Sequence, residues 1–184
     1  MTTTDLSKFN NSWYDPGANA LKRFTWYCVN AVWINSAFPI SGIKVVLLRM
    51  FGARIGTGVV IKPHVNIKYP WKLAIGDNVW IGENVWIDNL AQVVIEENVC
   101  ISQGALLLCG NHNYKKPTFD LIVGVIKLEK GVWIGAKATV CPGVTCHSHA
   151  VLAVGSVATA ALEANKIYQG NPAQFIRERK IEHA

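Results

Sequence analysis

An aliphatic side chain recurs every six residues along most of this 184-residue sequence. The series is Ile55, Ile61, Ile67, Ile75, Ile81, Ile87, Ile95, Ile101 and Leu107, and it resumes at Leu128, Ile134, Val140, Cys146 and Leu152. A helix repeats every 3.6 residues and a strand of an open sheet every 2, so neither explains a sustained period of six. Short strands joined by tight turns do explain it, because the stretches IGDNVW, IGENVW and IGAKAT supply Gly and Asn residues that adopt positive φ. The repeat therefore predicts an all-β solenoid, a parallel β-helix of triangular coils over residues 54–160.

Three steps of the series are longer than the others. The steps 67–75 and 87–95 each span eight residues, and the step 107–128 spans 21. All three fall at the third side of a coil. We therefore expect two small bulges and one extended loop, residues 108–127, at the same corner of the β-helix.

The residues on either side of the repeat lack its period. Residues 1–53 contain two apolar stretches, broken around Pro39 and Gly42, which predict a helical segment that caps the first coil. Residues 161–184 predict a turn followed by a short basic helix. The N-terminal helices have a second interpretation, a peripheral contact with a membrane surface through basic side chains. Those side chains would be Lys22, Arg23, Lys44 and Arg49.

Charge and cysteine content limit the partners and the compartment. A formal net charge of +6 favours anionic partners, but the basic residues are scattered and no nucleic-acid-binding motif is present, so we expect no nucleic acid partner. The five cysteines follow no paired spacing, which indicates reduced thiols. The amino terminus is polar and has no secretory signal pattern. We expect a cytoplasmic location, with the inner face of the membrane as an alternative.

One histidine lies in the only long interruption of the repeat. The stretch CGNHNYKKPTFDL places His112 in a loop of about twenty residues, a length that is uncommon in compact folds and is often functional. An imidazole with an ordinary pKa near 6.5 suits general-base chemistry at neutral pH. From its position alone, a catalytic and a structural role for His112 are equally supported. Lys115 and Lys116 follow it without an assigned role.

Two further histidines raise the question of a metal. His147 and His149 follow Cys146 closely, and zinc binds these residue types. Cys146, however, occupies an inward position of the repeat, so its sulfur should point away from both imidazoles. We favour an exposed turn over a zinc site, and we expect no metal.

Three tryptophans each precede an inward aliphatic residue. Strand alternation therefore turns Trp80, Trp86 and Trp133 outward. Several exposed tryptophans indicate a protomer interface or a ligand groove.

These motifs together resemble a known family. DLSKF, LLRMFGARIG, YPWKLAIGDNVWIGENVWI, CGNHNYKKPTFDL, VWIGAKATVCPGVT and GNPAQFIR extend over nearly the whole chain. The chain resembles the left-handed β-helix (hexapeptide-repeat) acyltransferases, and within them the colanic acid biosynthesis O-acetyltransferases. The subgroup is indicated mainly by YPW and PTFDL.

The resemblance implies an acetyl-CoA-dependent enzyme without a metal requirement. His112 matches the family's general base, which takes the proton from an acceptor hydroxyl as the oxygen attacks the thioester directly. Cys109 is the rival nucleophile for a covalent route, but at a strand end it is better explained as a packed thiol. Family members are homotrimers with active sites between neighbouring chains. The implied acceptor is a sugar, a nucleotide-sugar or a lipid-linked glycan of exopolysaccharide or cell-envelope biosynthesis.

The resemblance also assigns coenzyme A contacts. The backbone N–H of Ala136 would face the thioester oxygen and stabilise the oxyanion. Val154, Thr159 and Arg177 match further cofactor positions. Ala160 and Gln174 replace basic residues that relatives often carry, so the phosphate contacts could instead involve Lys166, Arg179 or Lys180.

The acceptor contacts have an equal structural alternative. Asp88 and Asn89 lie in the bulge of the coil before the His112 corner and could contact the acceptor, or they could only form the turn. The sequence is also compared with the requirements of three alternative functions. One is a non-catalytic β-helix scaffold that docks a partner or a membrane, the second is N-acyl transfer to an amino sugar, and the third is a zinc carbonic anhydrase on the same fold. The last needs three converging histidines, and the chain lacks that spacing.

Overall fold

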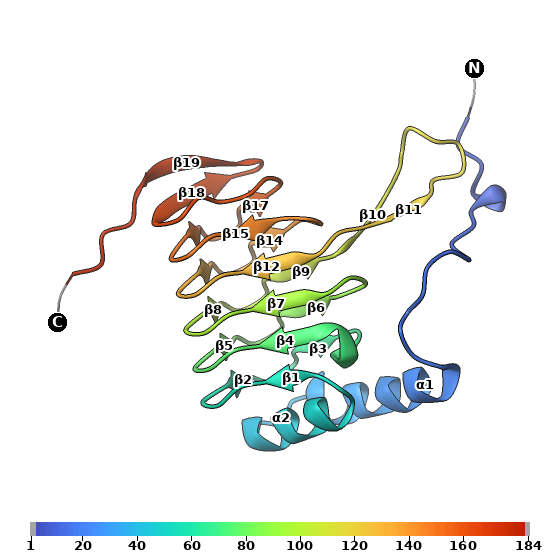
Figure 1. Cartoon of the computed structure of the whole chain (residues 1–184), viewed down its shortest axis with the longest axis horizontal. Coiled ribbons are helices and arrows are strands. Elements are labelled where there is room, and N and C mark those ends of the chain that lie inside the picture. Colours follow the sequence, from blue (N-terminus) through green and yellow to red (C-terminus); the bar gives the residue numbers. More distant parts are fainter. Residues whose placement is uncertain (1–2, 183–184) are drawn as a thin grey trace.

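The computed structural model describes residues 3–182 and shows a parallel β-helix with helices at one end (Figure 1). Each of five complete coils contributes one short strand to each of three parallel sheets, and a partial sixth coil follows. The first sheet contains β1 (Arg54–Ile55), β4 (Leu73–Ile75), β7 (Val93–Ile95), β12 (Ile126–Leu128) and β15 (Thr145–Cys146). The second contains β2 (Val60–Ile61), β5 (Trp80–Ile81), β8 (Cys100–Ile101), β13 (Trp133–Ile134), β16 (Val151–Leu152), β18 (Lys166–Gly170) and β19 (Ala173–Glu178). The third contains β3 (Asn66–Ile67), β6 (Trp86–Asp88), β9 (Leu106–Leu108), β14 (Thr139–Val140) and β17 (Val157–Ala158).

The six-residue series forms the core, as the sequence predicts. In the first sheet Ile75, Ile95, Leu128 and Cys146 stand in register, one above the other, and none is more than 4% exposed. Each added coil extends this column, so the aliphatic side chains bury one another without a second layer. Cys146 is fully buried, which confirms its predicted inward position.

The corners of the coils carry the predicted turn residues. Asn78, Asn84 and Asn98 adopt φ between 55° and 58°, in the left-handed region that Asn tolerates. At Gly135 the constraint is close approach, because a Cβ there would lie 2.6 Å from the backbone nitrogen of Val154 in the next coil. The two eight-residue steps lie at the corner between the third and first sheets, one of them around η3 (Pro70–Lys72).

The predicted loop 108–127 is an arm with its own strands. β10 (Gly110–His112) and β11 (Leu121–Val123) pair antiparallel, with His112 opposite Leu121. The arm leaves the third corner and projects from the β-helix (Figure 1). The β-branched Ile and Val of the stretch LIV favour a strand. Pairing β11 with β10 gives the backbone N–H and C=O groups protein partners, whereas in an open loop they would bond to water.

Two helices cap the first coil, in agreement with the prediction. α1 (Ala20–Val29) continues into the single wide turn η2 (Asn30–Ile34), and α2 (Ser41–Met50) follows after the break. Trp26 anchors α1, because its Nε1 donates to the Ile67 carbonyl at 2.9 Å. No helix within residues 3–182 has the length and apolar character needed to cross a bilayer.

The structure corrects one detail of the predicted membrane contact. Lys44 does not face outward; it is fully buried, and its Nζ donates to the carbonyls of Ile34 at 3.2 Å and Lys62 at 2.8 Å. Burial lowers the pKa of the Lys44 ammonium group. Ile34 is the last residue of η2, and Lys62 directly follows β2. The buried Lys44 side chain therefore joins the cap to the first coil.

The C-terminal basic helix predicted within residues 161–184 is wrong. β18 instead adds to β16, with Ile167 and Tyr168 beside Val151 and Leu152, and β19 folds back antiparallel onto β18. The reversal occurs at Gly170, whose φ is 106°. A helix would leave the edge of the last coil unpaired, whereas this hairpin satisfies it.

The beginning of the chain does not belong to the cap. Residues 5–16, which include η1 (Leu6–Lys8), run beside the arm before the chain reaches α1 (Figure 1). The Asp5 N–H donates to the Pro117 carbonyl at 2.9 Å, and the Tyr14 hydroxyl donates to the Leu90 carbonyl at 2.7 Å. The predicted cap segment 1–53 therefore contains two parts with different roles.

Candidate active site

The imidazole of His112 is fixed by groups of its own arm and of the N-terminal segment. Its Nδ1 lies 2.9 Å from the Phe119 carbonyl oxygen. Its ring stacks on the Phe119 ring at 4.5 Å between centroids, with 8° between the planes, and Phe9 contacts it at 5.6 Å. A carbonyl can only accept, so Nδ1 carries the proton and the neutral ring presents an unprotonated Nε2. This tautomer is the one that can act as a base through Nε2.

Phe119 has an unusual backbone conformation. Its φ of 50° lies in the left-handed region, where a bulky residue is uncommon. The conformation lets one residue supply both the stacked ring and the accepting carbonyl to His112. Strain of this kind concentrates at functional sites because surrounding contacts must maintain it.

A cavity of about 600 Å³ adjoins His112 and separates the arm from the body of the β-helix. Its lining residues include Phe9, Tyr14, Arg23, Lys68 and Leu121. Polar, aromatic and basic groups thus surround the histidine. Such a lining suits a polyhydroxylated ligand, which offers hydroxyls to polar groups and a ring face to aromatic ones.

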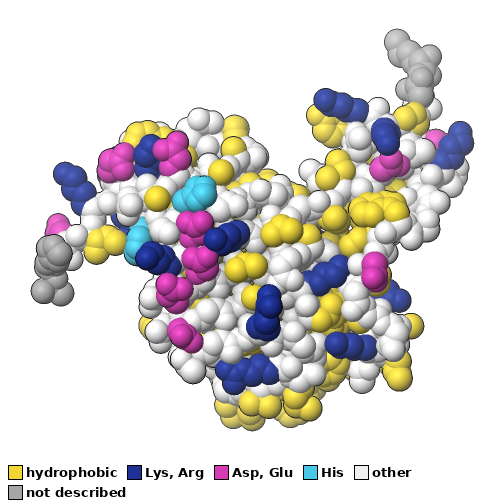
Figure 2. Space-filling model, in the orientation of Figure 1, with side chains coloured by type: hydrophobic (Ala, Val, Ile, Leu, Met, Phe, Trp, Pro, Cys, Tyr) yellow, Lys and Arg dark blue, Asp and Glu magenta, His cyan; other side chains and the backbone are white. Residues whose placement is uncertain are grey.

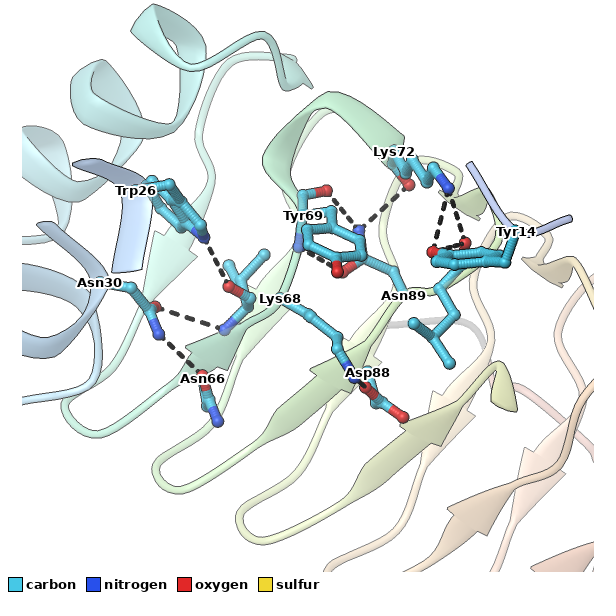
Figure 3. Close-up of polar contacts among 11 residues, drawn as sticks. Tyr14, Trp26, Asn30, Asn66, Lys68, Tyr69, Lys72, Asp88 and Asn89 are labelled. Carbon is cyan, nitrogen blue, oxygen red and sulfur yellow. Dashed lines mark hydrogen bonds and ion pairs between the residues drawn. The ribbon is translucent and has the colours of Figure 1, made fainter. Parts of the chain in front are cut away.

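The two predicted acceptor residues, Asp88 and Asn89, have different surroundings in the structure. Asn89 is fully buried, and its amide accepts from the Tyr69 N–H at 2.9 Å and donates to the carbonyls of Tyr69 and Lys72 (Figure 3). Its side chain therefore holds the preceding corner and is occupied. Asp88 is also buried, at 6% exposed, but its carboxylate pairs with a side chain that lines the His112 cavity.

Asp88 lies below the base of the arm. Its Oδ1 forms an ion pair with the Lys68 Nζ at 2.8 Å, and Lys68 lines the His112 cavity (Figure 3). Its Oδ2 lies 3.8 Å from the point that a Cβ on Gly110 would occupy, two residues before His112. The pair Asp88–Lys68 thus connects the predicted bulge to the wall of the cavity.

Tyr14 and Lys72 attach the N-terminal segment to this corner. The Lys72 Nζ donates to the Tyr14 hydroxyl at 3.1 Å and to the carbonyls of Asp15 and Leu90, and it lies over the Tyr14 ring (Figure 3). Burial raises the pKa of the Tyr14 hydroxyl and lowers the pKa of the Lys72 ammonium group. The segment that carries Phe9 to His112 is therefore firmly attached.

Cys109 is a packed thiol, in agreement with the sequence argument. It is fully buried, and burial raises its pKa to about 11. A thiol with this pKa is almost entirely protonated at neutral pH, and only the thiolate is an effective nucleophile. The environment of Cys109 therefore disfavours a covalent route through its sulfur.

Three of the predicted coenzyme A positions share one cavity. Ala136, Val154 and Arg177 line a groove of about 730 Å³ over the second sheet and its hairpin β18–β19. Trp133 and Ile176 contribute apolar walls. The groove offers apolar surface with a guanidinium at the β19 side, a combination that suits a long ligand ending in a phosphate.

The Ala136 amide is available for a ligand. The neighbouring Gly135 and Lys137 N–H groups donate to the carbonyls of Leu152 and Gln103 at 2.8 and 2.9 Å. Within residues 3–182 the Ala136 N–H has no such acceptor, and its residue lines the groove. A fixed donor of this kind can stabilise a developing oxyanion.

The remaining predicted phosphate contacts are placed differently. The Lys166 Nζ pairs with Glu163 and lies 5.1 Å from the Phe175 ring centroid, and Arg179 donates to the carbonyls of Gly131 and His149. Thr159 and Lys180 are exposed and lie outside the lining of the groove. Arg177 and Arg179 both line the groove, and within residues 3–182 neither forms an ion pair with a carboxylate. Nη1 of Arg179 is already engaged with the two carbonyls, which leaves Arg177 as the less occupied cation.

His112 and Ala136 do not meet within one chain. The arm of His112 arises where the third sheet passes to the first, whereas Ala136 lies in the turn between β13 and β14, where the second sheet passes to the third. The two cavities share no lining residue. One chain thus presents two separate cavities at different corners of the triangle.

The histidines near Cys146 have structural surroundings. His149 takes φ of 60° in a turn, and the His147 Nδ1 lies 3.3 Å from a Glu129 carboxylate oxygen. The buried Cys146 sulfur is directed into the core, away from both. Among the residues that the structure describes, no three His, Cys, Asp or Glu side chains form a group suited to a metal ion.

The aromatic and basic residues that complete the His112 cavity are not predicted by the sequence. Phe9, Tyr14, Arg23 and Lys68 come from segments 44 to 103 positions away from the histidine. The only signal was the aromatic content of the stretch SKFNNSWYDPG, which a capping segment does not need.

Comparison with known proteins supports the sequence-based interpretation. No protein-family model matches the chain. A protein of Escherichia coli (strain K12) named for colanic acid biosynthesis, the acetyltransferase WcaF, is 37% identical over 176 residues, covering 95% of this chain and 97% of the relative. The galactoside O-acetyltransferase of the same organism is 28% identical over 135 residues, covering 72% of this chain and 66% of the relative.

Solved structures show the same fold. The hexapeptide-repeat acetyltransferase VCA0836 from Vibrio cholerae superposes with a TM-score of 0.79 at 23% identity, covering 88% of this chain and 92% of that one. A galactoside acetyltransferase in complex with coenzyme A gives 0.76 at 25% identity, covering 86% and 80%. Because the similarity to WcaF extends over almost the full length of both chains, the protein belongs to the hexapeptide-repeat acetyltransferases and is an acetyltransferase built on a left-handed parallel β-helix.

Proposed function

We propose that this enzyme transfers the acetyl group of acetyl-CoA to a hydroxyl of a sugar in exopolysaccharide or cell-envelope glycan biosynthesis. The observation that carries the proposal is the 2.9 Å contact between the His112 Nδ1 and the Phe119 carbonyl oxygen, which in a neutral imidazole places the proton on Nδ1 and leaves Nε2 as the base. The name of the relative, which refers to colanic acid biosynthesis, supports the choice of a polysaccharide pathway.

The chemistry follows from this tautomer. Nε2 of His112 takes the proton of the acceptor hydroxyl while its oxygen attacks the thioester carbonyl. The Ala136 amide stabilises the resulting oxyanion, and collapse of the tetrahedral intermediate expels the coenzyme A thiolate, which receives the proton from the imidazolium. The raised pKa of Cys109 supports direct transfer without an acyl-enzyme.

The two separate cavities lead us to propose a homotrimer. His112 of one chain would face the Ala136 groove of its neighbour, because the two lie at different corners of the triangular β-helix, at the levels of adjoining coils. Exposed tryptophans on the second and third sheets support a protein interface there. The exposed fractions of Trp80, Trp86 and Trp133 are 61%, 44% and 46%.

The donor groove would hold coenzyme A along the second sheet. Val154 and Ile176 offer apolar contacts, and Arg177 can pair with a phosphate. The galactoside acetyltransferase of similar fold was solved with coenzyme A, which supports this use of the groove. The acceptor would occupy the His112 cavity, where Lys68 and Phe9 form part of the wall and Asp88 holds Lys68 in place from behind through their ion pair.

Calorimetric titration with acetyl-CoA tests the donor site. We expect Arg177→Gln to weaken binding roughly ten-fold or more, because a charge-assisted phosphate contact contributes about 1.5–3 kcal/mol. Lys130→Gln, a change of an exposed lysine outside the groove, should leave the affinity unchanged. Equal affinity for both variants would remove Arg177 from the site.

Complementation tests the shared site. His112→Ala and Ala136→Pro should each be inactive, the second because proline has no N–H. Co-expression of the two variants should restore part of the activity, because mixed trimers contain some interfaces with an intact histidine and an intact amide. Absence of recovery in mixed trimers would place both groups in a single chain.

A further inference from the structure

The helical cap exposes two apolar stripes. On α1 the exposed side chains Leu21, Phe24 and Cys28 follow the spacing i, i+3, i+7. On α2 the side chains Ile43, Val46 and Met50 follow the same spacing. Residues so spaced lie on one face of a helix. Leu48 and Lys44 of α2 face the coil instead, so the stripe is the outer face of the helix.

The exposed apolar area of the cap is large for a surface that faces water. Leu21 is 74% exposed, Val46 is 54% and Met50 is 73%. The remaining large apolar side chains exposed on the cap are Tyr27, Val32, Trp33 and Ile40. Figure 2 shows hydrophobic side chains along the lower edge of the molecule, where Figure 1 places α2. Exposed apolar side chains grouped in this way on one end of a molecule mark an interaction site.

The cap is also purely cationic. From residue 16 to residue 76 the sequence contains eight Lys and Arg residues and no Asp or Glu. Arg23, Arg49, Arg54 and Lys62 are exposed among them. Figure 2 shows basic side chains just above the apolar lower edge. These four side chains place exposed positive charge on the helices and on the first coil, the same end of the molecule that carries the apolar stripes.

We propose that the cap docks on the surface of a lipid bilayer that contains anionic lipid. Headgroup phosphates would meet the exposed cations, and the stripes would enter the boundary between headgroups and acyl chains. Aromatic side chains such as Phe24, Tyr27 and Trp33 suit this boundary. Helices of ten residues lie on such a surface and do not cross it.

A lipid surface fits these observations better than a second copy of the chain. Two cationic caps brought together would repel one another, because neither contributes a carboxylate from residues 16–76. A bilayer supplies both the apolar interior and the negative charge in one surface. The inference concerns the cap alone and does not depend on the proposed acetyl transfer.

Vesicle flotation tests the inference with the full-length protein. We expect binding to vesicles of phosphatidylcholine with 30% phosphatidylglycerol, and much weaker binding to phosphatidylcholine alone. Lys62→Gln should lower the partition coefficient roughly five-fold, because each cation near an anionic surface contributes about 1 kcal/mol. Lys130→Gln, which removes the charge of an exposed lysine outside the cap, should leave it unchanged.

The apolar contribution is tested in the same assay. Val46→Ser/Met50→Ser should lower binding to the anionic vesicles roughly ten-fold or more, since both side chains lose apolar area that the membrane would bury. Ile181→Ser changes an equally exposed side chain at the other end of the chain and should have no effect. All these side chains are exposed, so the melting temperature should stay constant. Absence of binding to anionic vesicles, equal losses in the control variants, or a lower oligomeric mass of the cap variant in solution would overturn the inference.

Discussion

The Phe119 carbonyl oxygen lies 2.9 Å from Nδ1 of His112, and the ring of the same phenylalanine stacks on the imidazole. One residue thus fixes both the tautomer and the plane of the proposed base. The main chain provides the hydrogen bond, so a side-chain substitution can remove the stacking while it keeps the acceptor.

Phe119→Ala should lower kcat roughly 10- to 100-fold with little change in the KM for acetyl-CoA, because a base that is no longer held in plane is misaligned with the hydroxyl. Steady-state rates measured as release of coenzyme A thiol check this prediction. Tyr114→Ala removes an exposed aromatic ring of the same arm and should retain nearly full activity. A comparable loss in both variants would show that the arm as a whole, and not the stacked ring, matters.

Cys109 should be dispensable for catalysis. Burial raises its pKa to about 11, so between pH 7 and 9 the thiol is protonated and a nucleophilic role is unavailable. Cys109→Ala should keep kcat within a few-fold of wild type. Iodoacetamide at pH 8 should modify the exposed Cys28 and spare Cys109, as peptide mass spectrometry can show. Complete loss of activity in a folded Cys109→Ala variant would point to an acyl-enzyme.

Asn89→Ala should reduce stability more than activity. The substitution leaves the Tyr69 N–H and the carbonyls of Tyr69 and Lys72 without their buried partner, which costs about 2–4 kcal/mol in the free energy of unfolding. Denaturant unfolding measures this cost. Asn35→Ala, at an exposed position, is the matched control and should change stability by less than about 0.5 kcal/mol. Equal stability of the two variants would contradict the structural role of Asn89.

Sedimentation equilibrium should give a mass three times the 20.2 kDa of one chain. Trp80→Ser/Trp86→Ser should shift the equilibrium toward monomers, because both side chains would lose a buried contact. Neither residue lines the groove of Ala136 or the cavity of His112, so the effect is separable from ligand binding. A wild-type protein that sediments as a monomer would contradict the shared site.

The coils could be predicted from the sequence because each strand packs on the equivalent strand of the next coil. The same pattern of core residues therefore recurs at short intervals along the chain. The corner bulges and the origin of the His112 arm followed from the same register. The C-terminal hairpin was missed because a short stretch such as AQFIRE does not distinguish a helix from a strand, and the open edge of β16 decided the outcome.

The surroundings of His112 could not be predicted for a different reason. The contacts of Asp5 with Pro117 and of Phe9 with His112 join segments more than 100 residues apart and leave no local pattern. Likewise, no sequence rule assigns a positive φ to Phe119, because the packing of the arm imposes it. The sequence therefore predicts His112 as the proposed base, and tertiary contacts define how its imidazole is held.

The most direct test of the central claim compares His112→Asn with the wild type. Coenzyme A release from acetyl-CoA is measured with methyl hexosides and nucleotide-sugars as acceptors, and the oligomeric mass and melting temperature are measured alongside. We predict that His112→Asn keeps its assembly and its affinity for acetyl-CoA but loses about 10²–10⁴-fold in kcat, the range expected for a general base. A folded His112→Asn variant whose kcat stays within a few-fold of wild type would contradict the account.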